Sequence, residues 1–318
     1  MTATGDHPVT PVTVVGGYLG AGKTTLVNHL LRNAAGLRLA VLVNDFGALP
    51  IDADLIESQD GDTIAIAGGC VCCSYGSDMT DALRQVLARD PAPDHIVLEA
   101  SGVALPGVIA ASVDLMPGLS TDGVVILADT ENLISAAAHP YMGDTITRQL
   151  ADADLVILNK IDLADPAPSV ALIARSAGRA AVVQAKEAAV PPDLILRRYP
   201  DAHRSAARHD TAGYATLSLP MVGAIDPQDL AQRLAKLGLL RAKGFVLDAQ
   251  GARWEVQATA ARATASPVSP GGPLGLVLIG LRETWDPDAL SAMLSPSGAD
   301  ARSKDTPDTH RETASPPL

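Results

Sequence analysis

A buried strand followed by a glycine-rich turn decides the fold of this chain, and residues 12–25 read VTVVGGYLGAGKTT. The first six residues have the apolar, β-branched character of a strand, and a helix is expected at about residues 23–34. The spacing between them matches the P-loop pattern G-x-x-x-x-G-K-[ST]. The specified positions are Gly17, Gly22, Lys23 and Thr24. A tight turn without a ligand is the alternative, but the strand-loop-helix context favours a phosphate site.

The residue types of this loop predict its chemistry. Small residues, including Gly20 and Ala21, let backbone N–H groups point at phosphate oxygens, and the following helix adds the positive end of its dipole. Lys23 is expected to reach the β- and γ-phosphates and the Thr24 hydroxyl to bind Mg²⁺, with Thr25 in the same nucleotide-binding set. We therefore predict that Lys23 and Thr24 act in catalysis as well as in binding.

Apolar segments of strand length continue to alternate with helix-length segments through the first two hundred residues. Such continuous apolar runs are typical of strands buried on both faces, as in a parallel sheet with helices on each side. The predicted fold is therefore α/β, a doubly wound, mostly parallel sheet of the P-loop NTPase kind. Strands are expected at 12–17, 39–45, 62–69, 95–101, 123–130, 155–160 and 180–185, with a further helix at about 77–89.

The composition becomes polar from about residue 197, and the alternation of elements changes there. A smaller α+β domain should follow, because shorter strand and helix patterns resume beyond this stretch. Its strands are expected near 215–219, 240–248, 252–258 and 274–281, and its helices at 226–237 and 286–294. The predicted organisation is a flexible N-terminus (1–10), a P-loop domain (11–198), a linker (199–214), a C-terminal domain (215–295) and a disordered tail (296–318).

Charge and composition limit the partners of the 318-residue chain. Its net charge of -12 argues against sequence-independent binding to nucleic acid or to an anionic membrane, because both need a basic surface. The first residues lack the basic and apolar regions of a secretory signal, and no apolar run approaches the roughly 18 residues of a membrane span. We expect a cytoplasmic chain whose thiols stay reduced and whose partners are proteins, small molecules or metal ions.

The sequence NKID at residues 159–162 predicts the base of the nucleotide. At the end of a buried strand, the carboxylate of Asp162 can accept hydrogen bonds from N1–H and the 2-amino group of guanine. Adenine offers an acceptor at N1 and no amino group at C2, and an unpaired buried carboxylate is costly. GTP is therefore favoured over ATP.

Two further strand ends carry candidate switch residues. In EASG (99–102), the Glu99 carboxylate is expected to reach Mg²⁺ or its water, and the Gly102 N–H to meet the γ-phosphate. In NDFG (44–47), Asp45 is expected in the Mg²⁺ water shell or near the thiols. Ordinary strand-end turns are the alternative at both places.

All three cysteines of the chain fall within GGCVCCS, residues 68–74. Thiolates of Cys70, Cys72 and Cys73 would select Zn²⁺, Cu(I) or an iron–sulfur cluster, and three ligands leave one tetrahedral position open. An incomplete site suits an ion that is handed on to another protein. Buried packing of the thiols or a redox pair of Cys70 and Cys73 are the alternatives.

Together these motifs resemble the CobW-like metallochaperone GTPases, relatives of the accessory GTPases that insert nickel into urease and hydrogenase. The resemblance covers about residues 10–295 and rests on GGYLGAGKTTLVNHLL, NDFG…ID, GGCVCCS, EASGVALP, QLADADLVILNKIDL and LLRAKGFV. It implies a slow GTPase that binds zinc or cobalt and delivers it to, or activates, a client metalloprotein. By motif match, Gly17, Gly22, Lys23 and Thr24 contact phosphate and Mg²⁺, Asn159, Lys160 and Asp162 contact guanine, and Cys70, Cys72 and Cys73 hold the metal.

The chain departs from the family pattern at several positions. Asp45 stands where the family usually has Glu, and Ala100 where it has Thr or Ser. Only His203 and His209 remain in the linker, so no histidine-rich storage loop is expected. A metal- or redox-sensing GTP-binding module without productive hydrolysis, and less so a P-loop kinase, stay as alternatives. The client and the oligomeric state, a homodimer included, stay open.

Overall fold

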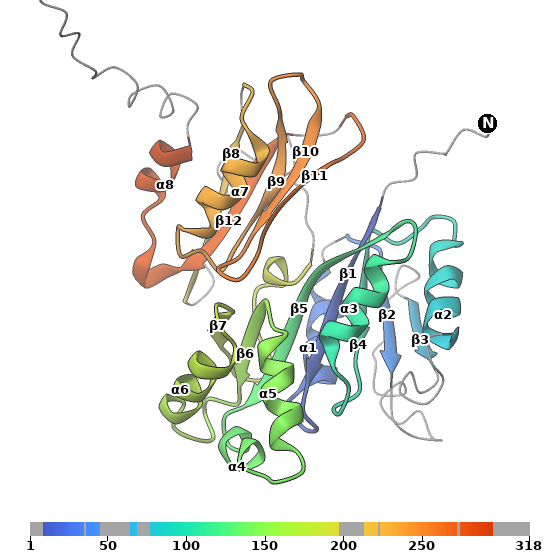
Figure 1. Ribbon diagram of the computed structural model, residues 1–318, viewed down its shortest axis with the longest axis vertical. Coiled ribbons are helices and arrows are strands. Elements are labelled where there is room, and N and C mark those ends of the chain that lie inside the picture. Colours follow the sequence, from blue (N-terminus) through green and yellow to red (C-terminus); the bar gives the residue numbers. More distant parts are fainter. Residues whose placement is uncertain are drawn as a thin grey trace, which may run out of the picture.

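The computed structural model describes residues 9–34, 36–44, 64–68, 77–196, 213–221, 223–271 and 274–294, and these form two β-sheets that follow one another along the chain (Figure 1). The first sheet has seven strands, all paired in parallel, in the order β3-β2-β4-β1-β5-β6-β7. Its strands are β1 (Thr10–Gly17), β2 (Leu39–Asn44), β3 (Ile64–Gly68), β4 (His95–Glu99), β5 (Leu119–Asp129), β6 (Leu155–Asn159) and β7 (Ala181–Gln184).

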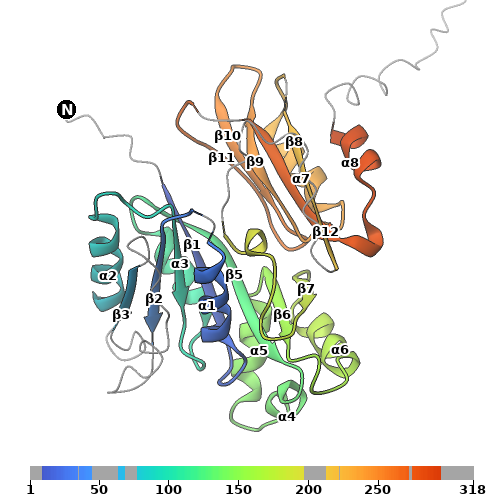
Figure 2. The ribbon, with the colours of Figure 1, turned by 180° about the vertical axis from the view of Figure 1, so that it is seen from behind.

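Helices cover both faces of the parallel sheet, as buried apolar strands require. Alternate strand residues pack with α2, α3, α4, α5 and α6 on one face, and with α1 and the segment 188–196 on the other. Accordingly, α1 lies in front of the sheet in Figure 2 and behind it in Figure 1. The helices are α1 (Lys23–Arg32), α2 (Ser77–Leu87), α3 (Pro106–Asp114), α4 (Leu133–Ala137), α5 (Gly143–Ala151) and α6 (Ala167–Ser176).

The second sheet is antiparallel throughout, with the strand order β11-β10-β9-β12-β8. Its apolar face packs against α7 (Pro227–Ala235) and α8 (Pro287–Leu294). Asp226 caps α7 by accepting hydrogen bonds from the N–H groups of Gln228 and Asp229. The strands are β8 (Tyr214–Pro220), β9 (Arg241–Leu247), β10 (Arg253–Ala258), β11 (Ala263–Pro267) and β12 (Gly275–Leu281). This sheet lies beyond the amino ends of the parallel strands (Figures 1 and 2).

The predicted fold class is confirmed, and each predicted strand is present with bounds that differ by a few residues. The prediction missed β11, whose sequence ATASP is short and mostly exposed and carries no apolar pattern. It also placed the start of β5 at residue 123, whereas the strand begins at Leu119. Among the residues that the structure describes, no helix has the length and apolar character needed to cross a membrane. The proposed domain boundaries stay a prediction.

Candidate functional site: the carboxyl edge of the parallel sheet

The P-loop occupies the turn between β1 and α1, and its glycines are there for steric reasons. Gly17 and Gly22 have φ angles of +128° and +103°, a region that L side chains rarely adopt. A Cβ on Gly22 would lie 2.5 Å from Nδ2 of Asn159, and one on Gly17 would lie 2.3 Å from the carbonyl oxygen of Leu127. By contrast, Gly20 has a positive φ of 76° but open space around it. Gly17 therefore lies against β5, and Gly22 lies against the end of β6.

The first turn of α1 connects the P-loop to β4. The hydroxyl of Thr24 donates to Oε1 of Glu99 at 3.2 Å, although the two residues are 75 positions apart in sequence. Strand pairing explains this contact, because β1 and β4 are neighbours with Val15 opposite Glu99. Lys23 is 9% exposed, and its Nζ donates to the carbonyl of Tyr18 at 3.3 Å. The predicted phosphate and switch residues thus meet at one edge of the sheet.

A hydroxyl beside a buried carboxylate is a donor set of hard oxygen ligands, and Mg²⁺ prefers oxygen ligands. Glu99 is 3% exposed, so its carboxylate is held close to the loop rather than in solvent. Thr25 lies exposed on the same turn of α1. The residues present therefore fit a magnesium ion bound together with a phosphate group.

The turn after β4 is held by a residue that the sequence prediction missed. Gln149 on α5 is 1% exposed, and its Nε2 donates to the carbonyls of Gly102 at 3.1 Å and Ala104 at 2.7 Å. A Cβ on Gly102 would lie 2.7 Å from Cδ2 of Leu19 in the P-loop. The predicted switch glycine is therefore packed against the phosphate loop, with α5 fixing its position.

The base motif follows β6 on the other side of the P-loop. Asn159 is 2% exposed, and both ends of its amide are used within the protein: Nδ2 donates to the carbonyl of Ala21 at 3.0 Å, and Oδ1 accepts from the N–H of Ala188 at 2.8 Å. Asn159 thus ties the P-loop to the segment after β7. The carboxylate of Asp162 is 39% exposed and lies 3.6 Å from Nζ of Lys186. Contact of these residues with guanine stays a prediction.

Two residues at the end of β5 support the base motif and were also missed. Asp129 accepts from Nζ of Lys160 at 2.8 Å, and the N–H and hydroxyl of Thr130 donate to the carbonyl of Asn159 at 3.0 and 2.6 Å. Burial by itself raises the pKa of Asp129, but hydrogen bonds from Lys160, Asn132 and the Glu131 N–H outweigh it, so the pKa lies below its ordinary value. A polar residue at the end of an apolar strand, as at Glu99 and Asn159, was the available signal.

The predicted metal ligands lie outside the described residues, as does Asp45. Within the described ranges, no group of three or more His, Cys, Asp and Glu side chains is arranged to hold a metal ion. The chain enters the cysteine segment from β3, which ends at Gly68 beside β2. Since β2 also pairs with β4, Gly68 and Glu99 both end strands at the carboxyl edge of the sheet.

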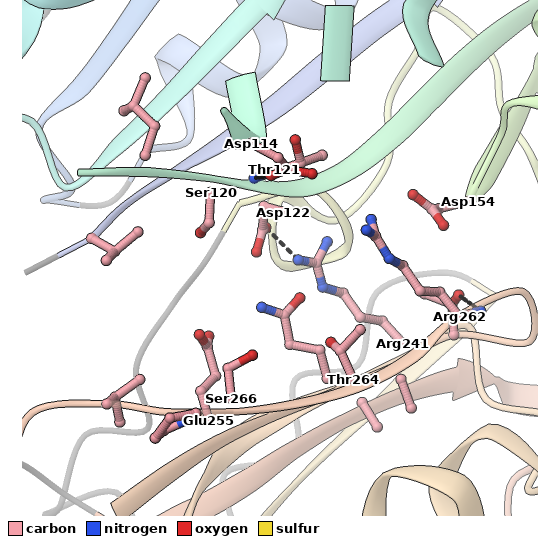
Figure 3. A pocket seen from close by; sticks show the side chains of 18 residues that line it. Asp114, Ser120, Thr121, Asp122, Asp154, Arg241, Glu255, Arg262, Thr264 and Ser266 are labelled. Carbon is pink, nitrogen blue, oxygen red and sulfur yellow. Dashed lines mark hydrogen bonds and ion pairs between the residues drawn. The ribbon is translucent and has the colours of Figure 1, made fainter. Parts of the chain in front are cut away.

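A cavity of about 360 Å³ lies at the opposite edge, between the two sheets (Figure 3). Asp122 and Asp154 face it from the parallel sheet, and Arg241 and Arg262 face it from the antiparallel sheet. The carboxylate of Asp122 binds both Arg241 and Lys243. Burial raises the pKa of Asp154, although the Val124 N–H and the charges of the two arginines oppose the shift. The sequence prediction assigned no role to this edge.

Comparison with known proteins identifies the nucleotide-binding part of the chain. Residues 11–188 match the family model for the CobW/HypB/UreG nucleotide-binding domain. The zinc chaperone CobW of a Sinorhizobium species is 28% identical, over 82% of this chain and 88% of the relative. The zinc chaperone CobW of Pseudomonas aeruginosa is 34% identical, over 58% of this chain and 59% of the relative.

Among solved structures, the Zn(II)-bound YjiA GTPase from E. coli is 21% identical, with a TM-score of 0.46 over 90% of this chain and 97% of that one. The match to the family model covers more than half of the chain and contains the P-loop, the switch carboxylate and the base motif. The chain belongs to the CobW/HypB/UreG family.

Proposed function

We propose that this chain binds GTP with Mg²⁺, hydrolyses it slowly, and uses this cycle to hold Zn²⁺ and pass it to a client metalloprotein. One observation carries the proposal: three motifs that are far apart in sequence converge at the carboxyl edge of the parallel sheet. The Thr24 hydroxyl meets Glu99 at 3.2 Å, and Asn159 meets the P-loop carbonyl of Ala21 at 3.0 Å. Ligands of open α/β sheets bind at this edge.

The phosphate chemistry is assigned to the P-loop and to the switch after β4. Lys23 would exchange the carbonyl of Tyr18 for phosphate oxygens, and Thr24 with Glu99 would hold Mg²⁺ or its water. When bound, Mg²⁺ neutralises charge that builds up on the phosphate oxygens during transfer. The backbone N–H groups of the P-loop and of Gly102 would orient the γ-phosphate.

Slow hydrolysis is proposed because neither the P-loop, nor EASG, nor NKID contains an arginine that could stabilise the transition state. Guanine is assigned to Asp162, whose carboxylate is close enough to solvent to receive a ligand. Asp45 is proposed to join the Mg²⁺ water shell or to lie near the thiols. A client that completes the site would raise the rate of hydrolysis, which links turnover to delivery.

Zinc is the proposed cargo, and Cys70, Cys72 and Cys73 are its proposed ligands. Three closely spaced thiolates suit Zn²⁺ and also accept Co²⁺. The names of two relatives, both zinc chaperones, favour Zn²⁺. Cys70 follows Gly68, the last residue of β3, by two positions in the sequence, and β3 pairs with β2, which in turn pairs with the strand that ends at Glu99. This arrangement supports coupling between metal occupancy and nucleotide state.

Competition titration tests the proposal. The reduced protein, kept free of oxygen, is titrated with Zn²⁺ against a chelator, with and without Mg²⁺ and a non-hydrolysable GTP analogue. We expect one Zn²⁺ per chain, an affinity that nucleotide changes severalfold, and loss of the site in a Cys70→Ser, Cys72→Ser, Cys73→Ser variant.

Lys23→Ala is the matched control for this titration, because it should keep the zinc site and lose only its nucleotide dependence. Zinc binding that ignores nucleotide in the wild-type protein would contradict the coupled cycle. Tight binding that survives in the triple variant would contradict the thiolate site. Tighter binding of Co²⁺ than of Zn²⁺ under the same conditions would change the cargo.

A further inference from the structure

The end of β5 forms a small bonded cluster around the base motif. Asp129, the last residue of β5, pairs in the sheet with Asn159, the last residue of β6. The N–H and hydroxyl of Thr130 both donate to the carbonyl of Asn159, at 3.0 and 2.6 Å, and Oδ2 of Asp129 accepts from Nζ of Lys160 at 2.8 Å. Backbone and side chain of the motif are therefore both held from the neighbouring strand.

The cluster is itself rigidly placed. Asp129 is 7% exposed, and it also accepts from Nδ2 of Asn132 at 2.9 Å and from the N–H of Glu131 at 3.0 Å. Thr130 is 4% exposed, and its carbonyl accepts from the hydroxyl of Ser169 on α6 at 3.3 Å. An acceptor with several fixed donors keeps one orientation, so its remaining partner is held in one place.

Lys160 is the residue on which this cluster acts. Its φ of +61° lies in the left-handed region, which is unfavourable for a lysine and persists only when the surroundings impose it. The side chain is still 31% exposed, so a ligand can reach it. Lys160 also lies between Asn159, which contacts the P-loop, and Asp162, which is assigned to guanine. Its conformation therefore decides where Asp162 is presented.

We propose that Asp129 is a positioning residue for recognition of the nucleobase, acting through Lys160, with Thr130 fixing the peptide before it. The carboxylate holds the lysine and the chain leading to Asp162 in the bound conformation before a purine arrives. Preorganisation of this kind raises affinity, because less conformational freedom is lost on binding. The inference deepens the proposed function and rests on it, since it takes the ligand to be a guanine nucleotide.

Binding of three probes to Asp129→Asn tests the inference. We expect the affinity for Mg²⁺–GTP to fall about tenfold, since Lys160 loses its anionic partner. The affinity for Mg²⁺–tripolyphosphate, which has no base, should stay within about twofold of wild type, because the P-loop is untouched. Comparison of Mg²⁺–ATP with Mg²⁺–GTP measures the preference for guanine over adenine, and the ratio of the two affinities should become smaller in the variant. Glu131→Gln is the matched control: the same chemical change, two residues away on an exposed side chain, should leave all three affinities unchanged.

A double-mutant cycle with Lys160→Met separates positioning from general damage. If Asp129 acts through Lys160, Asp129→Asn should add almost nothing in the Lys160→Met background. Asp129→Glu, which keeps the charge, should recover part of the GTP affinity and provides a second variant if the amide disturbs folding.

An equal loss for GTP and tripolyphosphate, or a full tenfold loss in the Lys160→Met background, would overturn the inference. Asp162→Asn in the same assay reports on the proposed function separately. If wild type itself showed no preference for GTP, the assignment of guanine would fail. If that preference were present and Asp129→Asn left it intact, only the role of Asp129 would fail.

Discussion

Strand β5 carries two buried aspartates seven residues apart, and each of them binds cationic side chains from another element. Asp122 binds Arg241 and Lys243 of the antiparallel sheet, and the three side chains are 0%, 10% and 9% exposed. Asp129 binds Lys160 at the end of the next strand, with side-chain exposures of 8% and 31%. The same pairing chemistry thus serves two different edges of one sheet.

The difference lies in what water and ligands can reach. At Asp122 both cations are buried, and Lys243 also lies 3.9 Å from Oε1 of Glu255, so removing the Asp122 carboxylate would leave two buried cations with one carboxylate fewer to pair with. At Asp129 the lysine can turn to solvent. Removing the Asp129 carboxylate would therefore release the Lys160 side chain into water and would leave no buried charge behind. Ion pairs closed on all sides join structural units, whereas a half-open pair can still respond to a ligand.

The largest expected effect concerns Asp122. Asp122→Ala should lower the free energy of unfolding by about 3–5 kcal/mol, the usual cost of removing one partner of a buried ion pair. Asp129→Ala should lose less than half of that, because Lys160 is rehydrated. Urea denaturation followed by circular dichroism measures both.

Asp144→Ala serves as the surface control, because its pair with Arg148 is 74% and 62% exposed and should contribute under about 0.5 kcal/mol. Equal losses at Asp122 and Asp129 would mean that exposure of the cation does not distinguish the two edges.

The second prediction tests how tightly the carboxyl edge is built. Gly22→Ala should weaken nucleotide binding about a hundredfold. The alanine would have to adopt a positive φ that is unfavourable for it, and its Cβ would lie 2.5 Å from Nδ2 of Asn159. Gly20→Ala has a positive φ but open surroundings, so strain alone should cost about fivefold. Titration with a fluorescent GTP analogue compares the two variants. Similar losses would show that backbone strain, and not the contact with Asn159, governs the loop.

The smallest expected effect concerns Asp154 at the edge between the two sheets. Because burial raises its pKa in the folded chain, the fold favours the protonated form. Its contribution to stability is therefore most favourable below the ordinary pKa of about 3.9 and is lost as the pH rises through the folded value. Asp154→Asn should raise the free energy of unfolding at pH 7 by up to about 1 kcal/mol and bring no gain near pH 3.

Denaturant unfolding across this pH range checks the sign for Asp154→Asn. Glu131→Gln, the same chemical change on an exposed side chain, is the control and should stay within about 0.5 kcal/mol of wild type at both ends. A gain of the same size at pH 3 and pH 7 would point to packing rather than to titration of the carboxylate.

Local pattern predicted much of this molecule, and the misses share one cause. The P-loop, the strand ends at Glu99 and Asn159, and the α/β class are visible in stretches of a few residues. Asp129 and Thr130 were missed because their partners are 29 to 31 positions away on a neighbouring strand. Strand β11 was missed because pairing with β10, and not its own composition, makes it a strand.

The sequence by itself determined every strand but β11 among those described, where the phosphate loop lies and which residue types can bind a nucleotide, since β-branched runs and glycines act through local sterics and burial. Only the tertiary structure decided that β1 lies between β4 and β5, which brings Thr24 to Glu99, and that β5 lies beside β6, which brings Asp129 to Lys160. It also decided that Asp122 meets the second sheet. The physical reason is that pairing between distant strands follows from burying both faces of a whole sheet, a condition that no short stretch of sequence contains.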